Sequence, residues 1–278
     1  MPTRMVYALR DHEKFVYHYT TAWKARDYIL KEGSLRLSSF ARTNDPKESL
    51  NWQFNFDSRQ GRDLGAYDPH KTSGYSEALK EGARLACFSL DAAPLSGDHV
   101  RDVLQRGFAR PRMWSQYGDG YAGVCLVFDR ARLIEDARRI FAQSLVFFGP
   151  VAYRARLSLR AIDLHEYMID VDRLEVLGER EYLREHLRRH NRALFFEKLP
   201  DWRDEVEWRI LVFADGEDDL YLPISGSLVG IAHGSSIDPS VSKEIREATA
   251  NGDVEHVGLI WKNGCPWFDF RPGLSEPK

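Results

Sequence analysis

One segment constrains the fold more than any other part of the chain: the strand-like run Val206 to Phe213, Val-Glu-Trp-Arg-Ile-Leu-Val-Phe. Its β-branched and aromatic residues favour a β-strand. On such a strand Glu205 and Glu207 lie two residues apart and face the same side. Two like carboxylates facing one way repel, so we expect one of them to have a raised pKa. The alternative is an edge strand whose polar face lies in water, with the pair balanced by Arg203 or Arg209.

The composition predicts a folded protein with a sizeable core. Of 278 residues, 43% are apolar, and seven Trp, twelve Tyr and fifteen Phe argue against a disordered chain. The net charge of −3, from 39 basic and 42 acidic residues, excludes a globally basic nucleic-acid coat. The same balance still allows local basic patches on the surface.

The cysteines and the N-terminus indicate a reducing compartment. Cys87, Cys125 and Cys265 lie far apart and form no CxxC, so we expect no disulfide framework. Apolar neighbours around Cys87 and Cys125 predict buried thiols with raised pKa. The N-terminus has no apolar signal-peptide core, and no run of 18 apolar residues suggests a membrane helix. We therefore expect a cytoplasmic protein without a membrane partner.

Strand-like and helix-like segments alternate along the chain, without repeats or long linkers. Strands are expected at 15–20, 35–38, 85–90, 124–128, 146–153 and 206–213, and near 219–223, 228–233, 254–261 and 267–271. Helices are expected at 22–32, 75–83, 130–140, across most of 156–199, and at 239–250. The pattern predicts an α+β fold with a mixed or antiparallel sheet core and inserted helices. We expect one domain over 1–278, with its core at about 15–271.

Two motifs suggest cofactors but have simpler interpretations. The GxGxxG at Gly118, Gly120 and Gly123 precedes a strand, whereas a dinucleotide fingerprint precedes a helix, so a tight turn is the better interpretation. His186 and His190 share a helical face but lack the glutamate of a metallohydrolase, so we expect a solvated basic face. The sequence predicts no metal site.

Polar and aromatic residues gather instead at expected strand ends and turns, where sites are commonly assembled. These residues are His18, Tyr19, Asn44, Asp45, Glu48, Trp114, Tyr117, Glu205, Glu207 and Arg209. They combine stacking faces, hydrogen-bonding groups and a carboxylate pair. We predict that His18, Trp114, Tyr117, Glu205 and Glu207 meet in one concave site.

Five short motifs in order resemble the DUF2971 family. They are Tyr17-His18-Tyr19-Thr20; Leu35-Arg36-Leu37-Ser38 with Asn44-Asp45-Pro46 and Glu48; Cys87-Phe88-Ser89-Leu90; Met113-Trp114-Ser115-Gln116-Tyr117 with Gly123-Val124-Cys125-Leu126-Val127-Phe128; and Lys198, Trp202, Glu205, Glu207, Trp208 and Arg209. The resemblance spans roughly 15–270. The family name denotes an unknown function, so the resemblance implies kinship and no chemistry.

A second resemblance, to the His–Tyr–Glu type of ADP-ribosyltransferase, does imply chemistry and an ADP-ribosyltransferase-like fold. His18 resembles the histidine that binds the NAD ribose, and Tyr117 or Tyr121 the tyrosine that stacks on nicotinamide. Glu205 and Glu207 resemble an ExE pair. The resemblance implies catalytic roles for Glu207, Glu205 and His18, and NAD as substrate. Its implied NAD-binding set is His18, Tyr19, Thr20, Trp114, Tyr117, Tyr121 and Arg209.

Three functions remain open from the sequence. The first is an NAD-dependent ADP-ribosyltransferase or NAD glycohydrolase that acts on an unknown protein or nucleic acid, in bacterial defence. The second is a non-catalytic sensor or nucleic-acid-binding module of a defence system. The third is a metal-dependent nuclease using Asp45, Glu48, Glu205 and Glu207. The arginines Arg101, Arg106, Arg110 and Arg112 lie in one long segment and are candidates for pyrophosphate contacts or a solvated lid.

Overall fold

The structure is a computed structural model that describes residues 14–68, 71–92, 94–155, 164–214 and 219–269. Its strands are β1 (Phe15–Thr20), β2 (Ser34–Ser39), β3 (Asn55–Asp57), β4 (Ala83–Ser89), β5 (Val124–Asp129), β6 (Leu145–Pro150), β7 (Ala152–Tyr153), β8 (Met168–Asp170), β9 (Glu197–Lys198), β10 (Glu207–Phe213), β11 (Leu220–Pro223), β12 (Leu228–His233), β13 (Glu255–Lys262) and β14 (Cys265–Asp269).

The α-helices are α1 (Ala22–Lys24), α2 (Pro46–Ser49), α3 (Lys71–Glu81), α4 (His99–Asp102), α5 (Pro111–Gln116), α6 (Arg130–Ile140), α7 (Val171–Leu177), α8 (Glu179–Phe195) and α9 (Pro239–Ala248). A π-helical turn, η2 (Ala25–Leu30), continues α1. The short 3-10 turns are η3 (Phe40–Arg42), η4 (Leu64–Ala66), η5 (Val103–Gln105), η6 (Gly107–Ala109), η8 (His165–Tyr167) and η9 (Pro200–Glu205). No helix among these residues has the length and apolar character needed to cross a bilayer.

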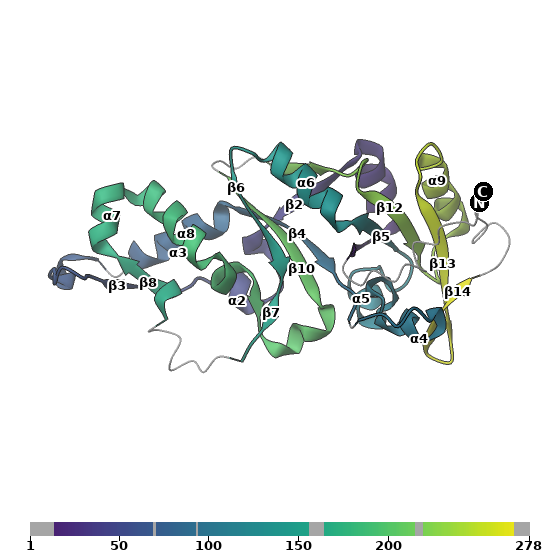
Figure 1. Cartoon of the computed structure of the whole chain (residues 1–278), viewed down its shortest axis with the longest axis horizontal. Helices are drawn as coiled ribbons and strands as arrows, with labels where there is room; N and C mark the ends of the chain where they lie inside the picture. The colour runs from purple at the N-terminus through teal and green to yellow at the C-terminus, as the bar shows by residue number, and fades with distance from the viewer. Residues whose placement is uncertain (1–13, 69–70, 93, 156–163, 215–218, 270–278) are drawn as a thin grey trace.

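Ten of the described strands form one mixed sheet. Its main path runs β11-β2-β4-β1-β5-β12-β13-β14, and β10 joins the far side of β4 and continues to β6. The β12–β13 pair is parallel and the other pairs in this sheet are antiparallel. The predicted α+β class with a mixed sheet core and inserted helices is confirmed (Figure 1). That residues 1–278 form one domain, with a core at about 15–271, stays a prediction, and residues 270 and 271 lie outside the described residues.

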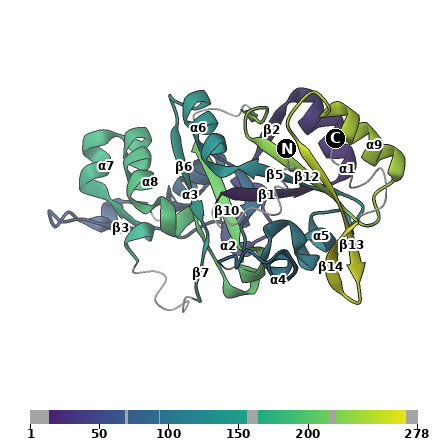
Figure 2. The same cartoon turned by 45° about the vertical axis from the view of Figure 1, so that its right-hand side comes forward.

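The two faces of this sheet are packed differently. Alternation along β10 turns Trp208, Ile210 and Val212 to one face, where they join a single hydrophobic cluster covered by α6, η2 and α9. The opposite face, which we name the site face, carries two separate clusters. One lies over the middle of β4 and β10 beneath α3 and α8, and the other over β1 and β5 beside η6 and α5. Figure 2 shows β1 between β10 and β5, with α5 to one side.

Some predicted elements differ from the structure. Helix α3 spans Lys71–Glu81, whereas the sequence predicted a helix at 75–83. Of the predicted helical region 156–199, α7 and α8 are helical, and residues 156–163 lie outside the described residues. Thr21 caps α1 through its side-chain oxygen, which accepts from the Lys24 backbone N–H.

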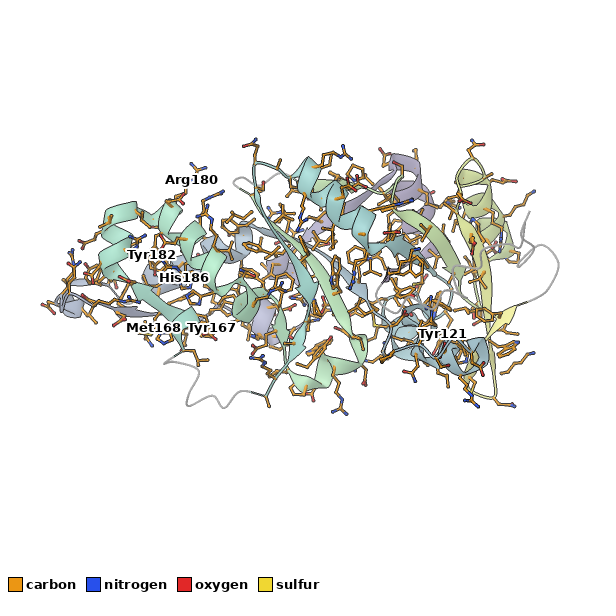
Figure 3. All side chains as sticks on the ribbon, in the orientation of Figure 1. Tyr121, Tyr167, Met168, Arg180, Tyr182 and His186 are labelled. Carbon is orange, nitrogen blue, oxygen red and sulfur yellow. The ribbon has the colours of Figure 1, made fainter. Side chains whose placement is uncertain are left out.

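The prediction of a solvated face at His186 is wrong. His186 is only 4% exposed and lies against Tyr182 at the α8 end of the molecule (Figure 3). Its Nε2 donates to the Glu166 carbonyl at 3.0 Å, and burial lowers its pKa to about 4. Arg188 and Arg189 of the same helix are exposed, so only part of the helix surface is solvated.

Candidate functional site

A cavity of about 240 Å³ lies on the site face where β1, β4 and β10 meet. Antiparallel pairing sets Ser89 of β4 directly opposite both Tyr17 of β1 and Glu207 of β10. Residues opposite one another point to the same face, so three strands contribute to one wall. The lining residues are Tyr17, His18, Tyr19, Arg42, Thr43, Asn44, Asp45, Glu48, Cys87, Phe88, Ser89, Met113, Tyr117, Lys198, Trp202, Glu205, Glu207 and Arg209.

The sheet opens at this point because β1 and β4 share only the Tyr17–Ser89 pair. The His18 ring replaces the missing backbone donor: its Nδ1 lies 2.9 Å from the Cys87 carbonyl oxygen. A carbonyl oxygen only accepts, so Nδ1 carries the proton. Burial lowers the pKa of His18, which keeps the ring neutral. Nε2 is therefore left as an acceptor, and His18 is one of the residues that line the cavity.

Five buried charged side chains form a continuous set that we name the cavity network: Glu48, Arg209, Glu207, Lys198 and Glu205. The Arg209 guanidinium donates to both oxygens of Glu207, at 2.5 and 2.9 Å. The same guanidinium lies 2.5 Å from Glu48. Lys198 Nζ lies 2.8 Å from Glu207 and 2.9 Å from Glu205. Each cation is thus shared between two carboxylates.

The backbone conformation at Glu205 and Glu207 differs from the predicted single strand. Glu205 ends the 3-10 turn η9, and Val206 has a left-handed backbone with φ of 43°, so only Glu207 lies on the strand. Lys198 brings the two carboxylates together from β9. The hydroxyl of Tyr117 donates to Glu205 at 2.9 Å. The arrangement therefore depends on a cation and a tyrosine, and not on two-residue strand spacing.

Of the two carboxylates of which one was expected to have a raised pKa, Glu207 has a lowered one. Burial would raise the pKa of its carboxyl, but Arg209 and Lys198 outweigh burial and lower it. In Lys198 the nearby carboxylates likewise outweigh burial and raise the pKa. Glu48 is the carboxyl whose pKa is raised, chiefly by burial. Glu207 and Lys198 therefore both stay charged at neutral pH.

Six of the catalytic and NAD-binding residues implied by the ADP-ribosyltransferase resemblance line this cavity: His18, Tyr19, Tyr117, Glu205, Glu207 and Arg209. The candidates Asn44, Asp45 and Glu48 line it as well. Trp114, Tyr121 and Thr20 do not line it. The indole Nε1 of the fully buried Trp114 donates to the Phe108 carbonyl at 2.8 Å. Tyr121 packs edge-on against Trp261 and lies near α5, away from the α8 end (Figure 3). These three residues shape the surrounding core, and the tyrosine at the cavity is Tyr117.

The predicted arginine segment supplies no lining residue. Arg106 is buried with Asp91 at 3.3 Å, and Arg110 donates to the Leu90 and Asp204 carbonyls. Arg112 donates to the Asp201 carbonyl, and Arg101 lies 3.4 Å from Asp98. The arginine at the cavity mouth is Arg42, which is exposed and has no hydrogen bond or ion pair within the described part of the chain. Arg42 therefore replaces these four arginines as the candidate for a pyrophosphate contact.

The turn at Gly118 to Gly123 has the role that the sequence suggested. A Cβ at Gly123 would lie 2.3 Å from the Thr20 carbonyl oxygen, so only glycine allows the turn to approach β1 this closely. Cys125 is buried and Cys87 is half-buried; burial raises the pKa of both thiols, as expected, and neither is disulfide-bonded.

Sequence reasoning assigned no function to Arg42, Thr43, Ser89, Lys198 and Trp202. Ser89 and Lys198 lie inside motifs of the DUF2971 resemblance, and this position could have identified them as candidate site residues. Arg42 and Thr43 have no such signal, because only the fold of the η3 turn brings them to the cavity. No group of three or more His, Cys, Asp or Glu in the described residues is arranged to hold a metal ion.

Comparisons with known proteins support kinship without a function. Residues 113–210 match the family described as "Protein of unknown function (DUF2971)", which confirms that resemblance over this segment. No curated protein matches the chain. Among solved structures the chain is similar to Thermus sp. 2.9 DarT in complex with NAD+, at 13% identity and a TM-score of 0.34, over 88% of this chain and 96% of that one. Similarity at this level leaves the function to be argued from the cavity itself.

Proposed function

We propose that the cavity binds the nicotinamide and ribose end of NAD, and that the protein transfers ADP-ribose to a protein or nucleic acid or hydrolyses NAD. One observation carries the proposal: a single cavity is lined by a neutral His18 whose Nε2 can accept, by Tyr117 and by the ionised Glu207. A ribose hydroxyl can donate to Nε2, and an aromatic face suits a pyridine ring.

The size of the cavity sets how NAD would lie. A volume of about 240 Å³ is below the roughly 300–1,000 Å³ of pockets that enclose a drug-sized ligand, so it suits one ring with its sugar. The rest of the dinucleotide would lie at the mouth, where Arg42 and Asn44 are exposed. A guanidinium without a partner in the described chain is suited to a pyrophosphate, because it can donate two parallel hydrogen bonds.

The chemistry requires stabilisation of a developing cation. When the bond between ribose C1 and the nicotinamide nitrogen breaks, its electron pair leaves with nicotinamide and positive charge develops on the ribose. The Glu207 carboxylate, held in place by Arg209 and Lys198, stabilises that charge. A hydroxyl or amine of the acceptor, or water, then forms the new bond to C1 and loses a proton. Tyr117 and Lys198 fix Glu205 beside it.

The test is direct. Purified full-length protein is titrated with NAD by calorimetry in the presence of a chelator and is then incubated with NAD, and released nicotinamide is measured by chromatography. We expect NAD binding and slow release of nicotinamide without added metal or acceptor. Isotope-labelled NAD offered with candidate proteins and nucleic acids separates transfer from hydrolysis. Absence of NAD binding at millimolar concentration by folded protein would overturn the proposal.

A non-catalytic binding module is the second candidate. The specific observation in its favour is that Glu205 and Glu207 both already contact a cation, which reduces the charge they can offer a reacting ligand. Tight NAD binding without nicotinamide release would favour this function. The nuclease has less support, since Lys198 and Arg209 lie between the carboxylates that would have to share a metal ion. The acceptor, the role in defence and the cytoplasmic location stay predictions.

A further inference from the structure

The cavity wall contains buried polar atoms that the protein leaves without a partner. Side-chain oxygens of Thr43, Asp45 and Ser89 are buried and accept or donate no hydrogen bond within the described residues. Because buried polar groups in folded proteins are nearly always hydrogen-bonded, such a concentration on one wall points to a ligand.

Asp45 presents a fixed acceptor. Its Oδ1 accepts a hydrogen bond from the Lys47 backbone N–H at 2.9 Å and so caps α2, which prevents the carboxylate from turning. Its Oδ2 has no hydrogen-bond partner, and the residue is 1% exposed. The carboxyl oxygen Oδ2 can accept a hydrogen bond, so it suits a ligand N–H or O–H.

Ser89 presents a donor at the same cavity. It is fully buried, its hydroxyl has no partner in the described residues, and strand register fixes it between Tyr17 and Glu207. The hydroxyl can donate one hydrogen bond to a ligand oxygen. A group that carries both an N–H₂ donor and a carbonyl acceptor matches this pair.

The charge of the cavity lining further restricts which ligand can bind. The buried lining holds four carboxylates, Asp45, Glu48, Glu205 and Glu207, against two cations, Lys198 and Arg209. A ligand carboxylate would meet this excess negative charge, whereas a neutral amide would not. The same excess favours a positively charged pyridinium ring beside the amide.

We propose that Asp45 and Ser89 form a primary-amide subsite, in which Asp45 accepts from the amide N–H₂ and Ser89 donates to the amide oxygen. The identity of the ligand rests on the proposed function: on NAD the amide is the nicotinamide carboxamide. The subsite gives the Asn44-Asp45-Pro46 turn a function in substrate selection as well as in starting α2.

Full-length protein is titrated by calorimetry with NAD and with nicotinic acid adenine dinucleotide, which differs only by a carboxylate in place of the amide. We expect NAD to bind at least about tenfold more tightly. Asp45→Asn keeps the cap but places an N–H₂ donor in the subsite, so it weakens NAD binding and strengthens binding of the acid, and the ratio falls about tenfold or more. Ser89→Ala weakens both ligands several-fold and leaves the ratio unchanged, because a hydroxyl serves either oxygen.

Asp238→Asn is the matched control. Asp238-Pro239 begins α9 in the same way that Asp45-Pro46 begins α2, and Asp238 caps its helix from the exposed surface. Asp238→Asn should change the melting temperature by the same small amount as Asp45→Asn. It should leave the ratio of the affinities for NAD and nicotinic acid adenine dinucleotide unchanged. An unchanged ratio in folded Asp45→Asn, with NAD still bound, overturns the subsite and leaves the proposed function intact. If wild-type protein binds neither dinucleotide, the proposed function and the subsite both fail.

Discussion

Two polar clusters in this protein use their hydrogen-bonding atoms in opposite ways. In the first, which we name the histidine chain, Ser242, His233, His256 and Thr249 bond in sequence at 3.0, 2.9 and 2.8 Å. The Thr249 hydroxyl donates to the Ile245 carbonyl, so it accepts from His256. One consistent direction of donation follows, from Ser242 through two neutral imidazoles to Thr249.

The cavity network contains stronger interactions but leaves more atoms without partners. Its cations are each shared between two carboxylates, and the carboxylates outnumber the cations. Beside it, Asp45 and Ser89 have buried oxygens without hydrogen bonds within the described chain. A satisfied chain costs little and stabilises the fold, whereas an incompletely satisfied wall costs stability unless a ligand completes it. We therefore expect changes in the histidine chain to affect stability alone and changes in the cavity network to affect binding and chemistry as well.

The largest expected effect comes from Arg209→Met. This change leaves Glu48 without its cation and leaves Glu207 to share Lys198 with Glu205. Breaking a buried ion pair on one side typically costs about 3–5 kcal/mol, so the free energy of unfolding from urea denaturation should fall by about that amount. Arg203→Met, at a side chain that is 75% exposed, is the control and should unfold like wild type. Equal midpoints for the two variants would mean that the network contributes nothing to stability.

Glu207→Gln should separate function from stability. Without this carboxylate, Arg209 still has Glu48 and Lys198 still has Glu205, so the two cations remain paired one to one and the protein folds. Loss of the charge facing the developing ribose cation should slow nicotinamide release about 10²-fold at similar NAD affinity. Glu205→Gln should slow it less. Equal rates for wild type and Glu207→Gln, measured by chromatography at saturating NAD, would remove Glu207 from the chemistry.

We expect the histidine chain to make the stability of the protein depend on pH. We do not expect it to make the affinity for NAD depend on pH. Burial, and after it Arg246, lowers the pKa of His256 to about 4, and burial lowers that of His233 further. Below the unfolded value of about 6.5, the unfolded chain takes up protons that the folded chain does not, so stability falls as pH drops from about 6.5 towards 4. The slope approaches about 1.4 kcal/mol per pH unit for each such histidine.

Melting temperatures of wild type and His256→Gln between pH 7 and pH 5 provide the measurement. The variant should be less stable at pH 7 and should lose less on acidification, because one titrating imidazole has been removed. His18, His186 and His190 also have lowered pKa values, so some slope remains in the variant. Parallel curves for the two proteins would show that His256 does not titrate on unfolding.

The sequence predicted the strands well because their signals are local. Apolar alternation marked β1, β4, β5 and β10 within a few residues of their observed ends. The helix at 130–140 matches α6, whose start is capped by Asp129. By contrast, α3 begins four residues before the predicted start, in a polar segment with several glycines, which have low helix propensity.

The site was only partly predictable because its assembly is not local. His18, Tyr117 and the two glutamates could be found from residue type and family resemblance, but their partners could not. Lys198 lies seven residues before Glu205 on a separate strand, and no periodicity links them. Trp114 and Tyr121 were chosen as aromatic faces, yet an aromatic residue close to a site in sequence more often packs in the core. Exposure, which decides between these roles, depends on the tertiary fold.

The smallest expected effect, from Arg42→Ala, tests where the cavity ends. Arg42 is exposed and belongs to neither buried cluster, so its removal should leave the melting temperature unchanged. If it contacts the pyrophosphate, NAD binding should weaken about fivefold, because an exposed ion pair contributes at most about 1 kcal/mol. The affinity of free nicotinamide, which has no phosphate, should not change.

Calorimetric titrations at low and high salt complete this test. Wild-type affinity for NAD should fall as salt screens the guanidinium, and the affinity of Arg42→Ala should fall less. Arg36→Ala is the matched control, since Arg36 is also exposed but pairs with Asp219 at 3.3 Å and does not line the cavity. Equal weakening by both variants would reflect a general loss of positive charge, and equal weakening of NAD and nicotinamide by Arg42→Ala would place Arg42 at the ring. If Arg42→Ala weakens the binding of NAD and not that of nicotinamide, the pyrophosphate lies at the mouth of the cavity, outside the network of buried charges that faces the ribose.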